Sequence, residues 1–335
     1  MNQPAGPDQV KMNPAMPSPT QDAASPPPDA EARADEVRAI VRDHYGEVAR
    51  RGAAAGCAPA SACAPGCCVP GAPTSSGHLG YDAAEAALAP DGADLGLGCG
   101  NPTAMASIRT GETVLDLGSG AGFDCFIASH QVGPTGQVIG VDMTPDMVSR
   151  ARANARKVGA GNVDFRLGEI EHLPVADASV DVILSNCVIN LSPDKAAVFP
   201  EAHRVLRPGG RLAVSDMMTR GQFTPEERAN LSAWAGCVTG AEDVALYAGV
   251  MRAAGFVDIS IVDKGEPAVE LGVAAFGDGG EGRGLAGRGV EADHQPVVAG
   301  AATGQRRRGG DRGQQGGAGA APRAAPSSLR CSHQR

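Results

Sequence analysis

The stretch that decides the fold is Val114-Leu115-Asp116-Leu117-Gly118-Ser119-Gly120-Ala121-Gly122. Its first residues form an apolar run typical of a buried strand, and the glycines after it predict a tight turn into a helix over 122–131. Glycine permits positive backbone angles and lets the main chain approach a ligand closely, while the helix that follows presents unpaired amide hydrogens. The stretch therefore predicts a ligand site at the carboxyl end of a strand.

Strand-like and helix-like segments alternate after this stretch. Strands are expected over 113–117, 137–141, 163–167, 180–185, 211–215 and 257–262, and helices over 122–131, 144–158, 193–206 and most of 224–250. Thr144 is the expected cap of the second of these helices, with Pro145 in its first turn. Such alternation predicts an α/β fold with a mainly parallel sheet and helices on both faces. The usual last strand should follow Gly265, where only the weak segment 269–276 is available.

Composition divides the 335 residues into four parts. Residues 1–34 are rich in proline and lack apolar periodicity, which predicts a disordered arm. Residues 35–109 are expected to cap the site, with a helix over 35–50, a cysteine-rich loop over 52–80 and a short helix over 81–89. Residues 110–265 hold the alternating pattern, with lid elements near their end. Residues 266–335 are rich in glycine and arginine and contain no lysine, which predicts a disordered tail or an aberrant reading frame.

Charge and hydropathy exclude several classes of partner. The net charge of −9 argues against a nucleic-acid partner, and nearby acids offset the basic run Arg306-Arg307-Arg308. No run of 18 apolar residues and no secretion signal is present, so we expect a cytoplasmic protein without membrane contact. The nine cysteines should then stay reduced unless they take part in chemistry.

The ligand at the glycine loop is not well described as a dinucleotide. A dinucleotide fingerprint requires G-x-G-x-x-G, but Phe123 occupies the third glycine position and Gly122 comes one residue early. Asp142 ends the second strand about twenty residues after the loop, where a carboxylate can accept both ribose hydroxyls. A ligand with a ribose remains favoured.

The loop, Asp116, Asp142, the pair Glu169-Ile170 and the turn at 207–210 together resemble the S-adenosylmethionine-dependent methyltransferases of the Rossmann-like class, over about residues 110–262. The resemblance implies S-adenosylmethionine as cofactor. Asp116 and the glycines would hold its methionine end, Asp142 its ribose, and Glu169 with Ile170 its adenine. The cofactor-binding positions that it implies are Asp116, Gly118, Ser119, Gly120, Gly122, Asp142, Met143, Glu169, Ile170 and Asn186.

Three cysteines are placed where such a fold binds its acceptor. Cys187 ends the fourth strand, Cys99 lies between two glycines, and Cys237 follows Gly236. Thiols flanked by glycine fill a core poorly, and thiolates suit a soft centre. Zinc sites usually show paired C-x-x-C spacings, which do not surround these three residues. Trivalent arsenic instead takes three thiolates and keeps a lone pair that can attack an electrophile.

The runs 95–102, 114–125 and 140–144, the string Ser185-Asn186-Cys187-Val188-Ile189-Asn190-Leu191 and the pair Gly236-Cys237 resemble arsenite methyltransferases of the bacterial type, over about residues 37–265. The resemblance implies an enzyme that methylates arsenite, and methylarsenite as well, for detoxification. We expect the protein to be a monomer. Cys99, Cys187 and Cys237 would be its catalytic arsenic ligands, and glutathione or thioredoxin its reductant. Leu97 stands where eukaryotic members tend to carry a tyrosine that contacts the cofactor.

Several alternatives stay open. Cys57, Cys63, Cys67 and Cys68 fit a loop that loads arsenite, an unstructured thiol-rich loop, or a structural zinc site. The whole protein also fits a methyltransferase for a small organic acceptor. A non-catalytic protein that sequesters metalloid is the third possibility, although it would not need the intact glycine loop.

Overall fold

The computed structural model describes residues 28–52, 75–261 and 291–299. These residues all belong to the first of two compact units, Met1–Gly304. Among them, no helix combines the length and apolarity that crossing a bilayer requires.

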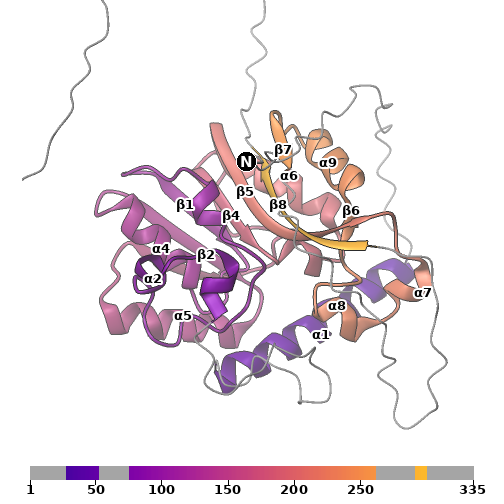
Figure 1. Ribbon diagram of the computed structural model, residues 1–335, viewed down its shortest axis with the longest axis horizontal. Helices are drawn as coiled ribbons and strands as arrows, with labels where there is room; N and C mark the ends of the chain where they lie inside the picture. Colours follow the sequence, from indigo (N-terminus) through magenta and orange to yellow (C-terminus); the bar gives the residue numbers. More distant parts are fainter. Residues whose placement is uncertain (1–27, 53–74, 262–290, 300–335) are drawn as a thin grey trace, which may run out of the picture. The chain divides into compact units, whose positions relative to one another are not determined.

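A single twisted sheet forms the centre of this unit (Figure 1). Its strands are β1 (Thr113–Leu117), β2 (Gln137–Asp142), β3 (Val163–Leu167), β4 (Val180–Asn186), β5 (Leu206–Arg220), β6 (Glu242–Asp243), β7 (Ile259–Ile261) and β8 (Glu291–Ala299). Their order is β3-β2-β1-β4-β5-β8-β7, with β6 paired to β5. Strands β1 to β5 run parallel to one another, and β8 runs antiparallel to both β5 and β7. The predicted α/β class with a mainly parallel sheet is confirmed.

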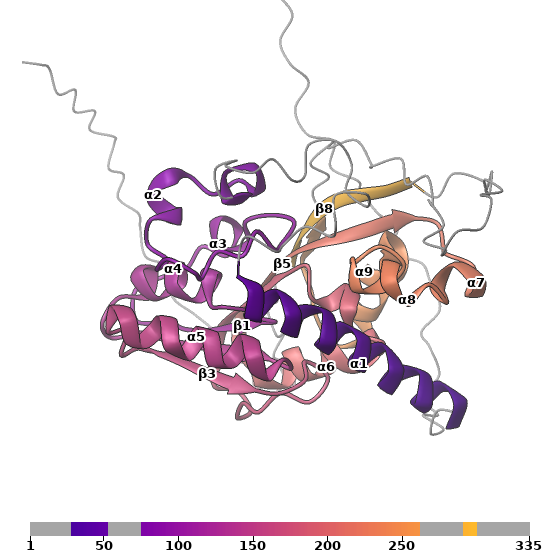
Figure 2. The ribbon, with the colours of Figure 1, turned by 90° about the horizontal axis from the view of Figure 1, so that it is seen from below.

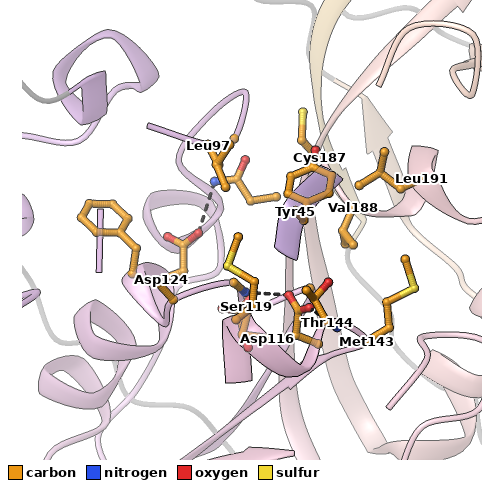
Figure 3. Close-up of a pocket in the computed structure, with 18 of the residues that line it drawn as sticks. Tyr45, Leu97, Asp116, Ser119, Asp124, Met143, Thr144, Cys187, Val188 and Leu191 are labelled. Atoms are coloured by element: carbon orange, nitrogen blue, oxygen red, sulfur yellow. Dashed lines mark hydrogen bonds between the residues drawn. The ribbon is translucent and has the colours of Figure 1, made fainter. Parts of the chain in front are cut away.

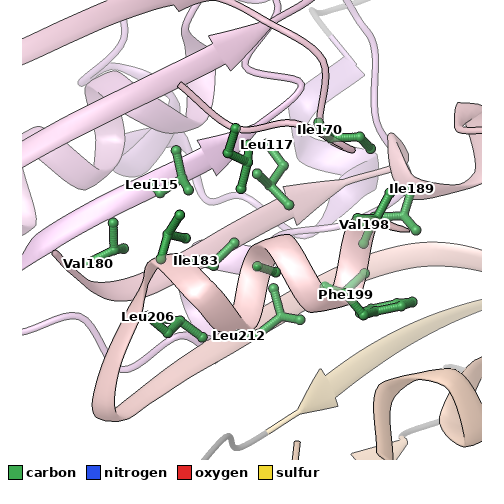
Figure 4. Close-up of a cluster of buried hydrophobic side chains, with 14 of the residues drawn as sticks. Leu115, Leu117, Ile170, Val180, Ile183, Ile189, Val198, Phe199, Leu206 and Leu212 are labelled. Atoms are coloured by element: carbon green, nitrogen blue, oxygen red, sulfur yellow. The ribbon is translucent and has the colours of Figure 1, made fainter. Parts of the chain in front are cut away.

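Helices cover both faces of the sheet because the side chains of each strand alternate between two apolar clusters. Val114 of β1 packs with α4 (Phe123–Val132) and α5 (Pro145–Val158). Leu115 and Leu117 of the same strand pack on the other face, with α6 (Lys195–Val205) and α9 (Val244–Ala253). Figure 4 shows Val198 and Phe199 of α6 turned toward this second cluster. The core therefore consists of two apolar layers with the sheet between them.

The remaining helices are shorter, apart from α1 (Pro28–Arg51). They are η2 (Ser75–Leu79), α2 (Ala83–Ala86), α3 (Pro102–Met105), η3 (Ile189–Leu191), α7 (Pro225–Arg228) and α8 (Leu231–Ala235). Helix α1 packs against α5 and α8, as Figure 2 shows from below. It buries Val37, Val41 and Val48, which share one helical face.

Two predictions for the N-terminal half need correction. Helix α1 begins at Pro28 rather than at residue 35, so the boundary placed at residue 34 is wrong. Thr144 is the N-cap residue of α5, but its side chain makes no capping hydrogen bond. Residues 1–27 of the expected arm lie outside the described residues, and so do the four loop cysteines.

The segment 224–250 is mostly helical, as predicted, but it is not one continuous helix. It is divided into α7, α8, β6 and α9, with a turn at 236–241 in which Cys237 has a φ of 63°. Gly240 passes so close to the backbone of Asn190 that a Cβ would overlap the Asn190 carbonyl oxygen. The glycines that flank Cys237 therefore end α8 and bring this turn against η3.

The expected disorder of 266–335 is wrong for β8. This strand pairs with β5 from Leu212 to Arg220, and its residues 297–299 also pair with β7. A strand after Gly265 was expected, but the position is 291–299; the segment 269–276 and the basic run at 306–308 lie outside the described residues. Strand β8 fills the gap between β5 and β7, so it completes the sheet.

Candidate active site

A pocket lies at the carboxyl ends of β1, β2 and β4, with an empty volume of about 1110 Å³. Figure 3 shows Asp116 and Ser119 on one side of it, and Tyr45 and Cys187 on the other. The predicted cofactor positions that line it are Asp116, Gly118, Ser119, Gly120, Asp142, Met143, Ile170 and Asn186. Two predicted positions, Gly122 and Glu169, are not among the lining residues. Most of the predicted cofactor positions therefore share one pocket.

The glycine loop shapes the floor of this pocket, and its glycines have different tasks. Gly118 has a φ of 64°, and a Cβ there would overlap the side chain of Val188. Gly120 has a φ of 51°, and a Cβ there would meet nothing within 4 Å. Gly122 has a φ of 95° and packs against Phe165, where a Cβ would lie 2.7 Å from the ring. Gly118 and Gly122 are thus required by packing, whereas Gly120 leaves open space for a ligand.

Three buried carboxylates, from Asp116, Asp124 and Asp142, line the pocket. Burial raises the pKa of each, that of Asp124 to about 6, and the charge of Asp124 raises the pKa of Asp116 further. Asp142 accepts hydrogen bonds from the backbone amides of Gly120, at 2.9 Å, and Thr144, at 2.8 Å. Buried acids that repel one another favour a cationic ligand.

The basic side chain among the described lining residues, that of Arg38, does not neutralise these acids. Its guanidinium lies 3.4 Å from the carboxylate of Glu169 and 3.6 Å from that of Glu171. The Ser119 hydroxyl is also buried without a hydrogen-bond partner. S-adenosylmethionine carries an ammonium group and a sulfonium group, and both are cationic. The buried carboxylates and the Ser119 hydroxyl therefore suit this ligand.

Glu169 was predicted to lie beside the adenine, but its carboxylate is used elsewhere. It pairs with Arg38 and with Arg42, which lies 3.5 Å away. Both arginines belong to α1, so Glu169 helps to hold α1 over the pocket. Its neighbour Ile170 does line the pocket and is 7 % exposed.

The structure brings the three predicted cysteines together from the loop before α3, the end of β4 and the turn after α8. Cys99 and Cys187 form a disulfide with a Cα–Cα distance of 5.8 Å. The Cys237 thiol donates to the backbone carbonyl of Cys187 at 3.2 Å. Burial raises the pKa of Cys237 to about 12, so this residue is a neutral thiol near pH 7. Cys187 lines the pocket, so the sulfur site and the pocket are adjacent.

Sequence reasoning missed a buried carboxylate beside these sulfurs. One oxygen of Asp216 and the sulfurs of Cys99 and Cys187 lie within 4.8 Å of one another. Asp216 accepts hydrogen bonds from the amides of Asn190, at 3.1 Å, and Met217, at 3.0 Å, and burial raises its pKa to about 7. Burial lowers the pKa of the nearby Lys195 to about 8. No motif marks Asp216, because it lies inside the apolar pattern of β5.

Three further residues in or beside the pocket were also missed: Tyr45 and Asp124 line it, and Tyr81 contacts Asp124. Tyr45 of α1 donates to the carbonyl of Ala235 at 3.3 Å and lies 3.9 Å from the Cys237 sulfur. It lies four residues after Val41 on the buried face of α1, a spacing that could have predicted it. Asp124 stands in the first turn of α4 and accepts a hydrogen bond from the Tyr81 hydroxyl. An acid directly after a glycine loop is a usable signal, but nothing local marks Tyr81.

Comparisons with known proteins relate this chain to methyltransferases. Residues 108–256 match a family described as a methyltransferase domain. The chain is 51 % identical to an arsenite methyltransferase of Halobacterium salinarum over 235 residues, which are 69 % of this chain and 60 % of that protein. It is 42 % identical to an arsenite methyltransferase of Aquipseudomonas alcaligenes over 173 residues, 50 % of this chain and 49 % of that protein.

A crystal structure of an arsenic(III) S-adenosylmethionine methyltransferase from Chlamydomonas reinhardtii is 38 % identical in sequence, with a TM-score of 0.46, and the match covers 57 % of this chain and 64 % of that one. The chain thus spans about half to two thirds of the length of these relatives. The resemblance predicted from the cysteine motifs is confirmed. Residues 108–256 of this chain match the methyltransferase domain family, and the chain is similar in sequence to arsenite methyltransferases.

Proposed function

We propose that the protein methylates trivalent arsenic, with S-adenosylmethionine as methyl donor and with the thiolates of Cys99, Cys187 and Cys237 as arsenic ligands. The observation that carries the proposal is the convergence of these three residues beside an acidic pocket that Cys187 lines. The names of the similar proteins support the same acceptor. Such an activity would serve arsenic detoxification.

The lining residues suggest how the donor would be held. Asp116 and Asp124 would pair with its ammonium group, and Gly120 leaves the room that the methionine chain needs. Asp142 keeps free lone pairs for ribose hydroxyls, and Met143 and Ile170 offer apolar surface to the adenine. When bound, S-adenosylmethionine supplies a methyl group that is electrophilic because it is attached to a sulfonium.

Loading of arsenite would consume thiol protons without a separate base. Each exchange forms one S–As bond, breaks one As–OH bond and releases one water, so the thiol proton leaves with the hydroxide. The high pKa of Cys237 then poses no obstacle, because ligation to the metalloid removes the proton. The arsenic keeps its lone pair. Holding that pair in line with the methyl group would lower the activation free energy, by roughly 7–11 kcal/mol in well-oriented intramolecular reactions.

Cys99 and Cys187 would also return the arsenic to its trivalent state. Methyl transfer uses the lone pair and leaves pentavalent arsenic. If the two As–S bonds to these cysteines then break and one S–S bond forms, an electron pair returns to the arsenic. A water molecule takes the vacated position as hydroxide and releases one proton, so the charge balances. The product of that step is the Cys99–Cys187 disulfide, the bond found in this structure. Glutathione or thioredoxin would then reduce it, and Cys99 is only half-buried.

The single tryptophan offers a direct test of arsenic binding. Trp234 is buried, its indole donates to the carbonyl of Leu191 at 3.1 Å, and its own carbonyl accepts from the amide of Cys237 at 2.9 Å. Arsenite added to the reduced protein should change the fluorescence of Trp234 and saturate at about one equivalent. Cys237→Ser should remove this response.

Absence of a response in the unsubstituted, reduced protein would contradict an arsenic acceptor and favour an organic one. Binding without any methylated product would instead indicate sequestration.

A further inference from the structure

The side chain of Asn186 joins the two segments that carry the disulfide cysteines. We propose that Asn186 is a positioning residue that fixes the loop of Cys99 against Cys187 and so sets the encounter of the two thiols. This assignment replaces the donor-binding role that the sequence suggested for Asn186. Its consequence for arsenic rests on the proposed function, but the contacts that support it do not.

The orientation of the Asn186 amide is fixed by one group that can only donate and one that can only accept. The backbone amide of Cys99 donates to Oδ1 of Asn186 at 3.0 Å. Nδ2 of Asn186 donates to the backbone carbonyl of Gly100 at 2.8 Å. Reversing the amide would put donor against donor and acceptor against acceptor. The Asn186 side chain therefore bonds to the amide of Cys99 and the carbonyl of Gly100, as the backbone of a neighbouring β-strand would.

The amide of Asn186 also contacts the pocket residue Asp124 and its hydrogen-bond partner Tyr81. Nδ2 of Asn186 lies 3.1 Å from the hydroxyl of Tyr81 and 3.2 Å from Oδ2 of Asp124. The Tyr81 hydroxyl donates its proton to Asp124, so its oxygen can accept from Asn186. Although Asn186 lines the pocket, its polar atoms are thus occupied by protein groups.

Packing also fixes the loop against this amide. Gly98 has a φ of 116°, and a Cβ there would lie 2.9 Å from both Oδ1 and Nδ2 of Asn186. Asn186 directly precedes Cys187, whose own amide donates to the carbonyl of Ser215 at 2.8 Å. Cys187 is held by β5, and Cys99 is held by Asn186. The Asn186 side chain therefore links the Cys99 loop to the strand end that carries Cys187.

Loss of the Asn186 amide should lower the effective concentration of one thiol at the other, because the Cys99 loop would lose the hydrogen bonds that hold it. The measurement uses the full-length protein equilibrated in glutathione redox buffers, with the Cys99–Cys187 disulfide quantified by differential alkylation and peptide mass spectrometry. Asn186→Ala should lower the equilibrium constant for this disulfide by about tenfold or more.

Asn162→Ala is the matched control. Asn162 is half-buried like Asn186, and its Nδ2 donates to the carbonyls of Ser129 and Gly133, both at 3.2 Å, at the other end of α4. Its substitution should leave the disulfide constant unchanged. Asn186→Asp is a second variant of the same shape, in which a carboxylate oxygen would face Gly100 and Asp124; it should also lower the constant.

Calorimetry with S-adenosylhomocysteine separates positioning from donor binding. The hydrogen bond from Asn186 lowers the pKa of Asp124, so the measurement is made at pH 8, where the Asp124 carboxylate stays ionised. There we expect the affinity of Asn186→Ala for this compound to fall much less than the disulfide constant, by no more than about threefold. An unchanged disulfide constant, or a tenfold loss of affinity for S-adenosylhomocysteine, would overturn the assignment. Because the redox measurement contains no arsenic, it stands even if arsenite proves not to be the acceptor.

Discussion

The Cys237 thiol donates a 3.2 Å hydrogen bond to the backbone carbonyl of Cys187, and both residues have left-handed backbones, with φ of 63° and 55°. Such a conformation costs an L-residue roughly 1–2 kcal/mol. The neighbours hold each residue in place, since the Cys187 amide donates to Ser215 and the Cys237 amide donates to Trp234. Strain at two residues whose thiol and carbonyl meet beside a pocket is typical of a functional site.

Replacing Cys237 by alanine or glycine should separate its chemical role from its backbone conformation. Both variants should lose methylation of arsenite, because each lacks the sulfur ligand. Glycine tolerates a φ of 63°, so Cys237→Gly should be at least as stable as Cys237→Ala, by up to about 1 kcal/mol. Denaturant unfolding measures the second difference. Methylation retained in either variant would remove Cys237 from the ligand set.

Alanine substitutions at Gly118 and Gly120 should have different effects. Gly118→Ala would push a Cβ into Val188, so unfolding free energy should fall by more than about 2 kcal/mol. Gly120→Ala would meet open space, so only the backbone cost of about 1 kcal/mol should appear. Its affinity for S-adenosylhomocysteine should nevertheless fall at least tenfold, since the new methyl occupies the ligand's space. Equal stability losses with intact binding in Gly120→Ala would contradict this division.

Donor binding should depend on the ionisation of Asp124. Burial raises its pKa to about 6, so the carboxylate that attracts an ammonium group forms as the pH rises through about 6. The affinity for S-adenosylhomocysteine should therefore fall as the pH drops from 7 to 5, by up to tenfold per pH unit below the pKa. Asp124→Asn should bind weakly at pH 7 and flatten this part of the profile. An Asp124→Asn profile identical to that of the unsubstituted protein would show that another group titrates.

The pairing of β8 predicts different effects for two truncations. Deleting residues 262–335 removes the strand that pairs with both β5 and β7. Since each net backbone hydrogen bond contributes about 1 kcal/mol, unfolding free energy should fall by about 3 kcal/mol or more. Deleting only residues 305–335, beyond the first compact unit, should leave thermal unfolding unchanged. If both truncations behave alike, β8 does not stabilise the sheet.

The elements that local pattern determines could be predicted closely. Strands β1 and β3 have the predicted bounds, because each is a short apolar or alternating run between turn residues. The glycine loop and Asp142 also lie where the pattern placed them, since parallel strands bring their carboxyl ends to one edge. These features depend on residues close together in sequence.

Contacts between distant segments could not be predicted in the same way. Cys99 and Asn186 are 87 positions apart, and no periodicity links them. Asp216 lies within the apolar pattern of β5, and nothing in that pattern indicates a site. Its place beside the sulfurs becomes visible only when β4 and β5 pair. Strand β8 was missed because the sequence around it is rich in glycine. Its strand structure depends on pairing with β5 rather than on local composition.

Transfer of a labelled methyl group tests the central claim most directly. The reduced protein would be incubated with arsenite, glutathione or thioredoxin, and S-adenosylmethionine carrying a heavy-isotope methyl group, and the arsenic species would be separated and weighed by mass spectrometry. The account predicts methylated arsenic that carries the label, absent from Cys187→Ser and Cys237→Ser. Protein that binds the donor and leaves arsenite unlabelled, or cysteine variants that still form labelled product, would contradict it.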